Sequence, residues 1–187
     1  DGAVEVMAFR RQGYLPEAMV NFLALLGWKK GDREKYALDE LVAAFGPEGL
    51  GKANAKFDRD KLLAFNTDAM AAAGEDRLLA GLKDYLALNG DAPGPIPAED
   101  DELLRRVLRA TQGFRTFADI PAKCGVLFAP DDSFDYDPKA ARKVLHKGGN
   151  QGLEALAALR DRLAACEWTP EALEKCIAVF AAERELG

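Results

Sequence analysis

Apolar residues recur at helical spacing along most of the chain. Met19, Phe22, Leu23 and Leu26 mark one apolar surface, which predicts a helix over about residues 16–26. Leucine, alanine, glutamate and lysine dominate the composition, and β-branched residues are too scattered to alternate as they would in strands. The pattern therefore predicts an all-α protein. Three further apolar sets mark helices: Leu38, Leu41, Val42 and Phe45; Leu103, Leu104, Val107 and Leu108; and Leu153, Leu156, Leu159 and Leu163.

Capping residues and prolines divide the pattern into separate helices. Gly13 predicts a break before Pro16, and Asp58 has the side chain of an N-cap. Further helix starts are predicted at Thr116 with Asp119, at Asp137-Pro138 and at Thr169-Pro170, the last helix running to Gly187.

Glycines predict where helices stop or split. Gly27 can adopt the left-handed conformation that ends a helix, and Gly74 and Gly81 make the helix expected over 68–88 fragile or split. Gly148-Gly149 should break another helix. Three prolines and two glycines in residues 89–97 exclude regular structure there. This segment is either a domain linker or a tight loop between helices.

Asn21 is unusual among the apolar residues of 16–26. A buried amide must find hydrogen-bond partners or cost about 1–3 kcal/mol. We interpret Asn21 as tying neighbouring backbone together; a surface-facing asparagine is the alternative.

Composition excludes several classes of protein. With 187 residues, 49% hydrophobic and 30% charged, the chain suits one or two packed domains, and no apolar run approaches the roughly 20 residues that cross a bilayer. We expect a cytoplasmic protein with no membrane contact. Cys124, Cys166 and Cys176 form no C-x-x-C pair, so we expect reduced thiols and no metal site, and His146 is expected to lie at a helix end.

The net charge of −6 argues by itself against nucleic-acid binding, but the cations are clustered. The window 103–117 contains four arginines and no acid, and the window 139–147 contains four cations and no acid. Such runs are either solvated helix faces or phosphate contacts. The candidate RNA-binding residues are Arg105, Arg106, Arg109, Arg115, Lys139, Arg142 and Lys143.

Two strings of residues resemble a known family. Residues 13–18 (GYLPEA) and 21–28 (NFLALLGW) are similar to the G-Y-L-P-E-A and N-Y-L-x-x-L-G-W patterns of bacterial glutamyl-tRNA synthetases, which are class I aminoacyl-tRNA synthetases. Phe57-Asp58, Lys61-Leu62 and Asn66 resemble a second pattern, F-D-x-x-K-L-x-x-x-N. Weaker echoes follow in the expected order at residues 116–117, 127–128 and 168–173.

The resemblance implies a particular organisation and partner. It implies a helical stem-contact domain at 1–68, a first anticodon-binding helical bundle at 69–130, and a second, incomplete one at 131–187. The implied partners are tRNA(Glu) and the catalytic domain of the same parent chain, in a monomer. The parent enzyme would attach glutamate to tRNA with ATP and Mg²⁺, whereas this fragment would hold no cofactor.

The sequence departs from the family pattern in two places. Relatives that discriminate an anticodon base use an arginine two residues before a K/R/D-T-L triplet, and the matching position before Arg115-Thr116-Phe117 is Gly113. Nothing here matches the P-L-R segment and helical pair that follow the position of Gly187 in the family. We therefore expect an expressed fragment, cut at both ends.

The chain carries no sequence typical of catalysis. It has no G-x-x-x-x-G-K-S/T or H-x-G-H pattern, and its acid pairs lie at predicted turns and helix starts. An alternative function is a helical protein-interaction module without RNA contact, which the negative charge and Trp28, Phe114 and Trp168 would favour. Those aromatic residues are otherwise expected in the core.

Overall fold

The computed structural model describes residues 5–51, 56–90, 96–130 and 136–185. The described residues form helices and no strand; a single isolated bridge joins Trp28 and Leu50. The all-α prediction is confirmed. The chain divides into two compact units, residues 1–132 (unit 1) and 133–187 (unit 2).

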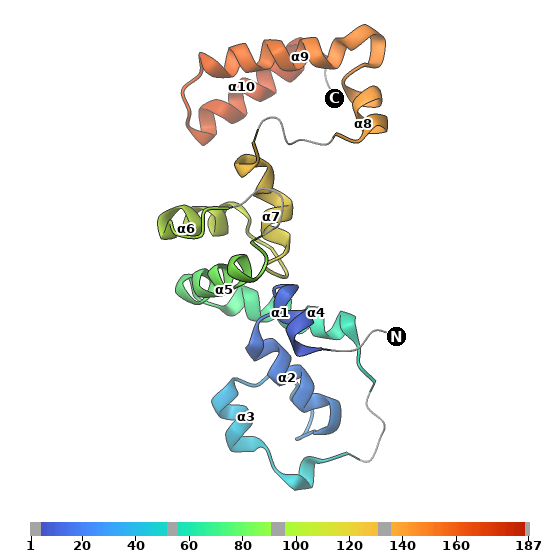
Figure 1. Ribbon diagram of the computed structural model, residues 1–187, viewed down its shortest axis with the longest axis vertical. Coiled ribbons are helices and arrows are strands. Elements are labelled where there is room, and N and C mark those ends of the chain that lie inside the picture. The colour runs from blue at the N-terminus through green and yellow to red at the C-terminus, as the bar shows by residue number, and fades with distance from the viewer. Residues whose placement is uncertain (1–4, 52–55, 91–95, 131–135, 186–187) are drawn as a thin grey trace. The chain divides into compact units, whose positions relative to one another are not determined.

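Unit 1 contains seven α-helices and two 3₁₀ turns among its described residues (Figure 1). They are α1 (Val6–Arg11), α2 (Pro16–Gly27), α3 (Leu38–Ala44), η1 (Pro47–Gly49), α4 (Arg59–Ala72), α5 (Glu75–Leu88), α6 (Asp101–Ala110), α7 (Asp119–Cys124) and η2 (Gly125–Phe128). The main core joins Leu15 and Ala18 of the first helices to Leu82, Leu104 and Ile120. This core therefore holds α2, α4, α5, α6 and α7 together.

The residues of the first family pattern connect segments that are distant in the sequence. Gly13 has a φ of +80°, and its carbonyl accepts the Phe117 N–H at 3.0 Å. The predicted break at Gly13 is thus confirmed, and it also brings the chain against residue 117. Pro16 is the first residue of α2, where its missing N–H costs no hydrogen bond.

Asn21 is buried and ties backbone as predicted. Its Nδ2 donates to the Glu34 carbonyl at 2.8 Å, and its Oδ1 accepts the Tyr36 N–H at 2.9 Å. The amide therefore fixes the turn that leads into α3. Trp28 is also buried, and its Nε1 donates to the Gly46 carbonyl at 3.0 Å beyond α3.

The residues of the second pattern link distant segments of unit 1. Asp58 caps α4 as predicted, accepting the N–H groups of Asp60 and Lys61 at 3.0 Å. Asn66 is fully buried; its Oδ1 accepts the Leu15 N–H at 2.8 Å and its Nδ2 donates to the Arg115 carbonyl. One amide thus joins the start of α2 to the loop before α7.

The helix expected over 68–88 as fragile or split is split at Gly74: α4 ends at Ala72 and Gly74 caps α5, whereas Gly81 lies inside α5. Other predicted helix limits are wrong. Gly27 does not adopt a left-handed φ; the extended conformation of Trp28 ends α2 instead. Helix α4 runs through residue 68, where the first domain boundary is expected.

Three further features of unit 1 differ from the prediction. Thr116 is not an N-cap, since Ala118 precedes α7; the Asp119 carboxylate nevertheless accepts the Thr116 N–H at 3.2 Å, as expected of a capping box. Helix α1 was not expected, because its six residues are too short for a helical period to stand out. Leu23, predicted on the apolar surface, is 42% exposed.

Unit 2 contains α8 (Pro138–Val144), α9 (Lys147–Ala164) and α10 (Pro170–Glu183). Gly148, Gly149 and Asn150 have positive φ values, which confirms the predicted break within α9. Asp137 and Thr169 cap α8 and α10 as predicted. Helices α9 and α10 lie side by side as a hairpin (Figure 1).

Unit 2 buries few side chains. Phe180 is its buried hydrophobic residue among those described, whereas Trp168 is 74% exposed. The expectation that Trp168 belongs to the core is wrong, because a two-helix hairpin leaves the residues at its turn exposed. Trp28 and Phe114 are buried as expected. Helix α10 ends at Glu183, so the prediction that the last helix runs to Gly187 is wrong. The predicted turn at Asp131-Asp132, most of the proline-rich stretch and residues 186–187 lie outside the described residues.

Candidate nucleic-acid interface

Helix α8 presents a cationic face. Lys139, Arg142 and Lys143 are spaced three and four residues apart, so they share one side of the helix, and all three are exposed. Among the residues that the structure describes, none of these three side chains forms an ion pair. Their charge is therefore available to an anionic partner.

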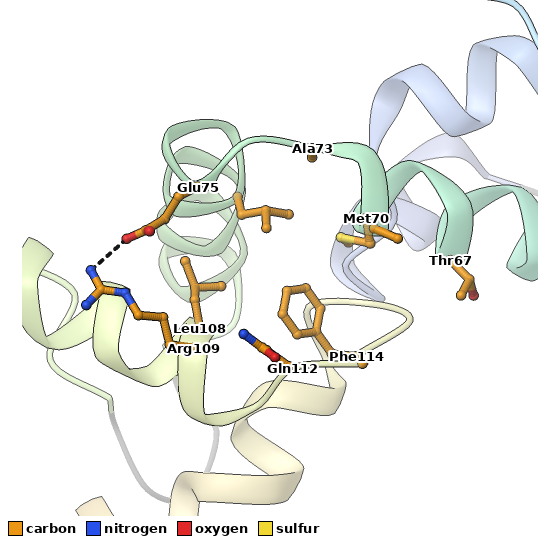
Figure 2. A pocket seen from close by; sticks show the side chains of 11 residues that line it. Thr67, Met70, Ala73, Glu75, Leu108, Arg109, Gln112 and Phe114 are labelled. Atoms are coloured by element: carbon orange, nitrogen blue, oxygen red, sulfur yellow. Dashed lines mark hydrogen bonds and ion pairs between the residues drawn. The ribbon is translucent and has the colours of Figure 1, made fainter.

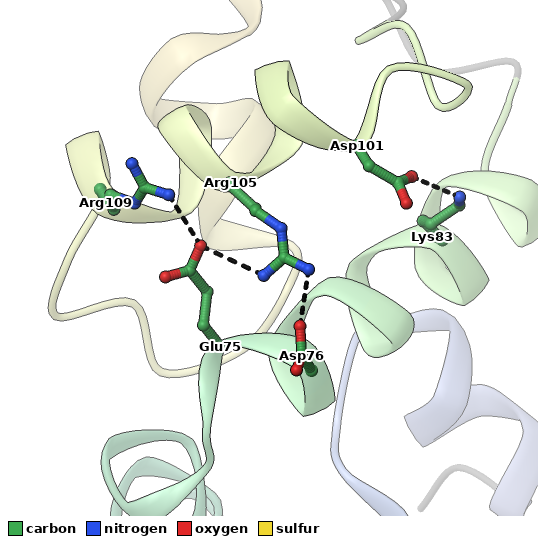
Figure 3. Close-up of polar contacts among 6 residues, drawn as sticks. All are labelled: Glu75, Asp76, Lys83, Asp101, Arg105 and Arg109. Carbon is green, nitrogen blue, oxygen red and sulfur yellow. Dashed lines mark hydrogen bonds and ion pairs between the residues drawn. The ribbon is translucent and has the colours of Figure 1, made fainter.

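Two of the α6 arginines are held by acids. Figure 3 shows Arg105 between two carboxylates at the start of α5: its Nη1 lies 3.3 Å from Glu75 Oε1, and its Nη2 lies 2.6 Å from Asp76 Oδ1. Arg109 Nη2 lies 3.0 Å from the same Glu75 oxygen. Lys83 and Asp101 pair at 2.6 Å between the same two helices.

The ion pairs with Arg109 and Arg105 change the pKa of the Glu75 carboxyl. The Arg109 hydrogen bond lowers the pKa of the Glu75 carboxyl, Arg105 lowers it further, and partial burial opposes both. Glu75 and Asp76 together thus balance the charges of Arg105 and Arg109. Any stability from this network is present above the ordinary pKa of Glu75 and is lost as the pH falls through the lowered value.

A pocket of about 370 Å³ adjoins this network (Figure 2). Met70, Leu108 and Phe114 form its apolar part, and the Glu75–Arg109 pair lies at one side. Gly113 also lines it, with a φ of +81° and open space where a Cβ would lie, since no other atom comes within 4 Å of that point. The pocket could receive a flat apolar group with polar edges.

The other two arginines of the 103–117 window have no ion-paired side chain among the described residues. Arg106 and Arg115 are exposed, and neither forms an ion pair with the residues that the structure describes. The Arg115 backbone is fixed, because its N–H is bound by Asp119 at 2.7 Å and its carbonyl by Asn66. Of the seven predicted cations, Arg105 and Arg109 are ion-paired, whereas the other five form no ion pair with a described residue.

Sequence reasoning missed the acids that hold Arg105 and Arg109. Glu75 and Asp76 are about thirty residues away in the chain, and the packing that brings them to Arg105 and Arg109 is tertiary. The available signal was Gly74 followed by two acids, a combination typical of a helix start.

Other candidate chemistry is sparse. His146 follows α8, as expected of a helix-end residue, and its Nδ1 lies 2.7 Å from Asn150 Oδ1. Cys124, Cys166 and Cys176 are free thiols. No group of three metal-binding side chains occurs in the part of the chain that the structure describes. No helix there is both long enough and apolar enough to cross a membrane.

Comparison with known proteins defines the class. Residues 77–187 match the family model of the anticodon binding domain, and residues 1–64 match that of the catalytic domain of class I tRNA synthetases for E and Q. The chain belongs to the anticodon-binding domain family.

The similar proteins are glutamate–tRNA ligases, which confirms the resemblance found in the sequence. The chain is 39% identical to glutamate–tRNA ligase 1 of Syntrophus aciditrophicus, over 83% of this chain and 32% of that protein. It is 36% identical to glutamate–tRNA ligase 1 of Alkalilimnicola ehrlichii, over 99% of this chain and 38% of that protein. A solved glutamate tRNA ligase from Elizabethkingia meningosepticum aligns with a TM-score of 0.69 at 25% identity, over 96% of this chain and 34% of its own.

The chain therefore spans less than two fifths of the length of these relatives. The family match does not support the alternative of an interaction module without RNA contact.

Proposed function

We propose that this chain is the tRNA-binding, anticodon-recognising portion of a glutamate–tRNA ligase. The observation that carries the proposal is the match of residues 77–187 to the anticodon binding domain. The whole enzyme would join glutamate to tRNA(Glu) with ATP, in the cytoplasm and as a monomer. ATP and Mg²⁺ would be held by the larger catalytic part of the parent enzyme, in line with the match of residues 1–64 to the class I catalytic domain.

The proposed organisation keeps three functional parts. A stem-contact part at 1–68 would be followed by anticodon-binding bundles at 69–130 and 131–187. The first boundary would then fall within the continuous helix α4, and the first two parts would share the core of unit 1.

The cationic face of α8 is the proposed phosphate contact of unit 2. Single-stranded loops are recognised by side chains that meet phosphates and unstacked bases. Lys139, Arg142 and Lys143 need not give up an acidic partner within the described structure, so binding RNA costs them little.

Changing all three α8 cations to glutamine should weaken binding of a tRNA(Glu) transcript and reduce its salt dependence. Each lost phosphate contact should flatten the log–log slope of affinity against salt by roughly 0.7–0.9. Fluorescence anisotropy across a sodium chloride series measures the slope. Glutamine at Lys175, an exposed cation on α10, is the control for a change of charge elsewhere on unit 2. An unchanged slope in the triple variant would contradict the α8 contact, and no binding by the wild-type chain would contradict the proposed function.

The pocket beside Gly113 is the proposed site for an anticodon base. Its apolar wall can stack on a base, and Arg109 and Gln112 supply donors and acceptors at its edge. Glycine at 113 offers no side-chain donor, so we assign recognition of the base to Arg109, which lines the same pocket. A tRNA with a substituted anticodon should bind less tightly than tRNA(Glu), and Arg109→Ala should narrow that difference.

Removing the Glu75 carboxylate should strengthen RNA binding. In Glu75→Gln, Arg109 loses its acidic partner while Arg105 keeps Asp76, so the salt slope should steepen by about 0.7–0.9 when Arg109 then reaches a phosphate. Asp161→Asn, which frees Arg160 on α9, is the matched control. Equal effects of the two variants on anisotropy titrations would show that only net charge changed.

A further inference from the structure

Two of the three cysteines lie close together in the hairpin of α9 and α10. Cys166 follows the end of α9, where its N–H donates to the Leu163 carbonyl at 3.1 Å, and Cys176 lies near the middle of α10. Both are half-buried free thiols. The hairpin thus holds two reduced sulfur atoms on neighbouring segments of unit 2.

The first turn of α10 positions the Cys166 side chain. Its Sγ lies 3.5 Å from the Ala172 carbonyl oxygen, and the Ala172 N–H donates to the Thr169 hydroxyl at 3.3 Å. Ala172 is about one helical turn before Cys176, and side chains in an α-helix lean toward the helix N-terminus. The Cys176 side chain therefore leans over the same turn that the Cys166 thiol contacts.

The Cys166 thiol responds to the neighbouring sulfur. Burial raises the pKa of the Cys166 thiol, and the charge of a Cys176 thiolate and a hydrogen bond with Cys176 raise that pKa further. The Glu167 carboxylate adds to the rise in pKa. Cys166 therefore keeps its proton beside an ionised Cys176, so a nucleophilic thiolate has a second thiol within reach.

Cys124 lies in a different environment. It is buried in the core of unit 1, where its Sγ donates to the Ile120 carbonyl at 3.2 Å and burial raises the pKa of its thiol. The sequence of unit 1 contains no second cysteine. Cys124 is therefore an internal control for any chemistry that requires two thiols.

We propose that Cys166 and Cys176 form a reversible oxidation site, at which hydrogen peroxide converts the two thiols into a disulfide that links the hairpin turn to α10. The Cys176 thiolate attacks one peroxide oxygen, the O–O bond breaks, and Cys176 becomes a sulfenic acid. Hydroxide leaves and takes up the proton that Cys176 had released. The inference concerns a modification of the chain and does not depend on RNA binding.

The second step closes the disulfide. The Cys166 thiol attacks the sulfenic sulfur of Cys176, the S–S bond forms, the S–O bond breaks, and the hydroxyl leaves as water with the Cys166 proton. Two thiols are thereby oxidised, and one hydrogen peroxide is reduced to two waters. A dithiol reductant reverses the reaction by thiol–disulfide exchange.

The disulfide would add a restraint where unit 2 has little core. Phe180 is the buried hydrophobic residue of unit 2 among those described, so little apolar packing holds α10 against α9. A disulfide stabilises a fold by restraining the unfolded chain, and small cores gain most from it. Oxidation should therefore slow the opening of the hairpin around residues 164–176.

The test treats the reduced 187-residue chain with hydrogen peroxide and counts free thiols with a maleimide label. The wild type should fall from three free thiols to one, lose about 2 Da, and yield a cross-linked peptide that contains Cys166 and Cys176. Dithiothreitol should restore the three thiols. Hydrogen–deuterium exchange over 164–176 should be slower in the oxidised chain than in the reduced one.

Single variants separate a paired site from independent oxidation. In Cys166→Ser, Cys176 should stop at a sulfenic acid that dimedone traps, whereas in Cys176→Ser the remaining Cys166 thiol should react more slowly. Cys124→Ala should form the disulfide as the wild type does. Oxygen added to each cysteine without a cross-linked peptide, or disulfides that form between chains alone, would overturn the proposal. A disulfide that leaves the exchange unchanged would overturn its effect on the hairpin.

Discussion

Asn66→Ala should destabilise unit 1 by about 3 kcal/mol or more. The substitution leaves the Leu15 N–H and the Arg115 carbonyl without their partner, and each buried group without a hydrogen bond costs about 1–3 kcal/mol. The lost side-chain volume adds to that cost, because Asn66 is fully buried. Urea unfolding measured by circular dichroism gives the change in free energy.

A graded series tests the cause of this loss. Asn66→Asp keeps an acceptor for Leu15 but cannot donate to Arg115, and it places a charge in the core, so it should also be strongly destabilising. Gln112→Ala, which removes an exposed amide from the same unit, should change stability by less than about 0.5 kcal/mol. Similar losses in Asn66→Ala and Gln112→Ala would contradict the role assigned to Asn66.

Gly13→Ala should destabilise unit 1 by about 3–5 kcal/mol. A φ of +80° costs a residue with a side chain of order 1–3 kcal/mol, and the new Cβ would lie 2.6 Å from the Phe117 nitrogen and 2.9 Å from that of Ala118. Both neighbours are backbone atoms, which cannot rotate away. The midpoint of thermal unfolding should fall by about 3 °C for each kcal/mol.

Two other glycines separate the contributions of backbone conformation and close contact. Gly31 has a φ of +65° and no neighbour within 4 Å, so Gly31→Ala should show only the conformational cost, about 1 kcal/mol. Gly27 has neither feature and ends α2 at the surface, so Gly27→Ala should be neutral or stabilise by up to about 1 kcal/mol. A Gly13→Ala loss no larger than that of Gly31→Ala would show that the loop at 117 moves away.

Local rules predicted the helix class and most helix starts, because caps and prolines act within a few residues. Asp58, Asp137 and Thr169 cap helices as their sequence contexts indicate. The tying role of Asn21 was also predictable, since a polar residue among apolar ones needs partners. Its actual partners, in the turn at 34–36, depend on tertiary packing.

The state of each cation was not predictable from the sequence. The windows around Arg105 and Lys139 look alike, each a basic run without acids, yet Arg105 is held by Glu75 and Asp76 while Lys139 is exposed with no ion pair to a described residue. The difference arises from the packing of α5 against α6, which brings distant acids to one arginine cluster. Exposure of Trp168 has a similar origin, because only the three-dimensional packing shows how little covers the hairpin of unit 2.

The Asn66 tie has a consequence for building chimaeras from relatives. One family match ends at residue 64 and the other begins at residue 77. The segment between them would be the natural place to join parts of different synthetases. Yet Asn66 hydrogen-bonds to both Leu15 and Arg115, and the Gly13 carbonyl accepts the Phe117 N–H, so residues on both sides of this junction pack against each other. If residues 77–187 were exchanged, the new segment would need a loop that packs against Gly13 and a backbone carbonyl that accepts the Asn66 side-chain N–H. Whether such a chimaera folds therefore depends on these buried contacts of Asn66 and Gly13, and not on the sequence of the joining segment.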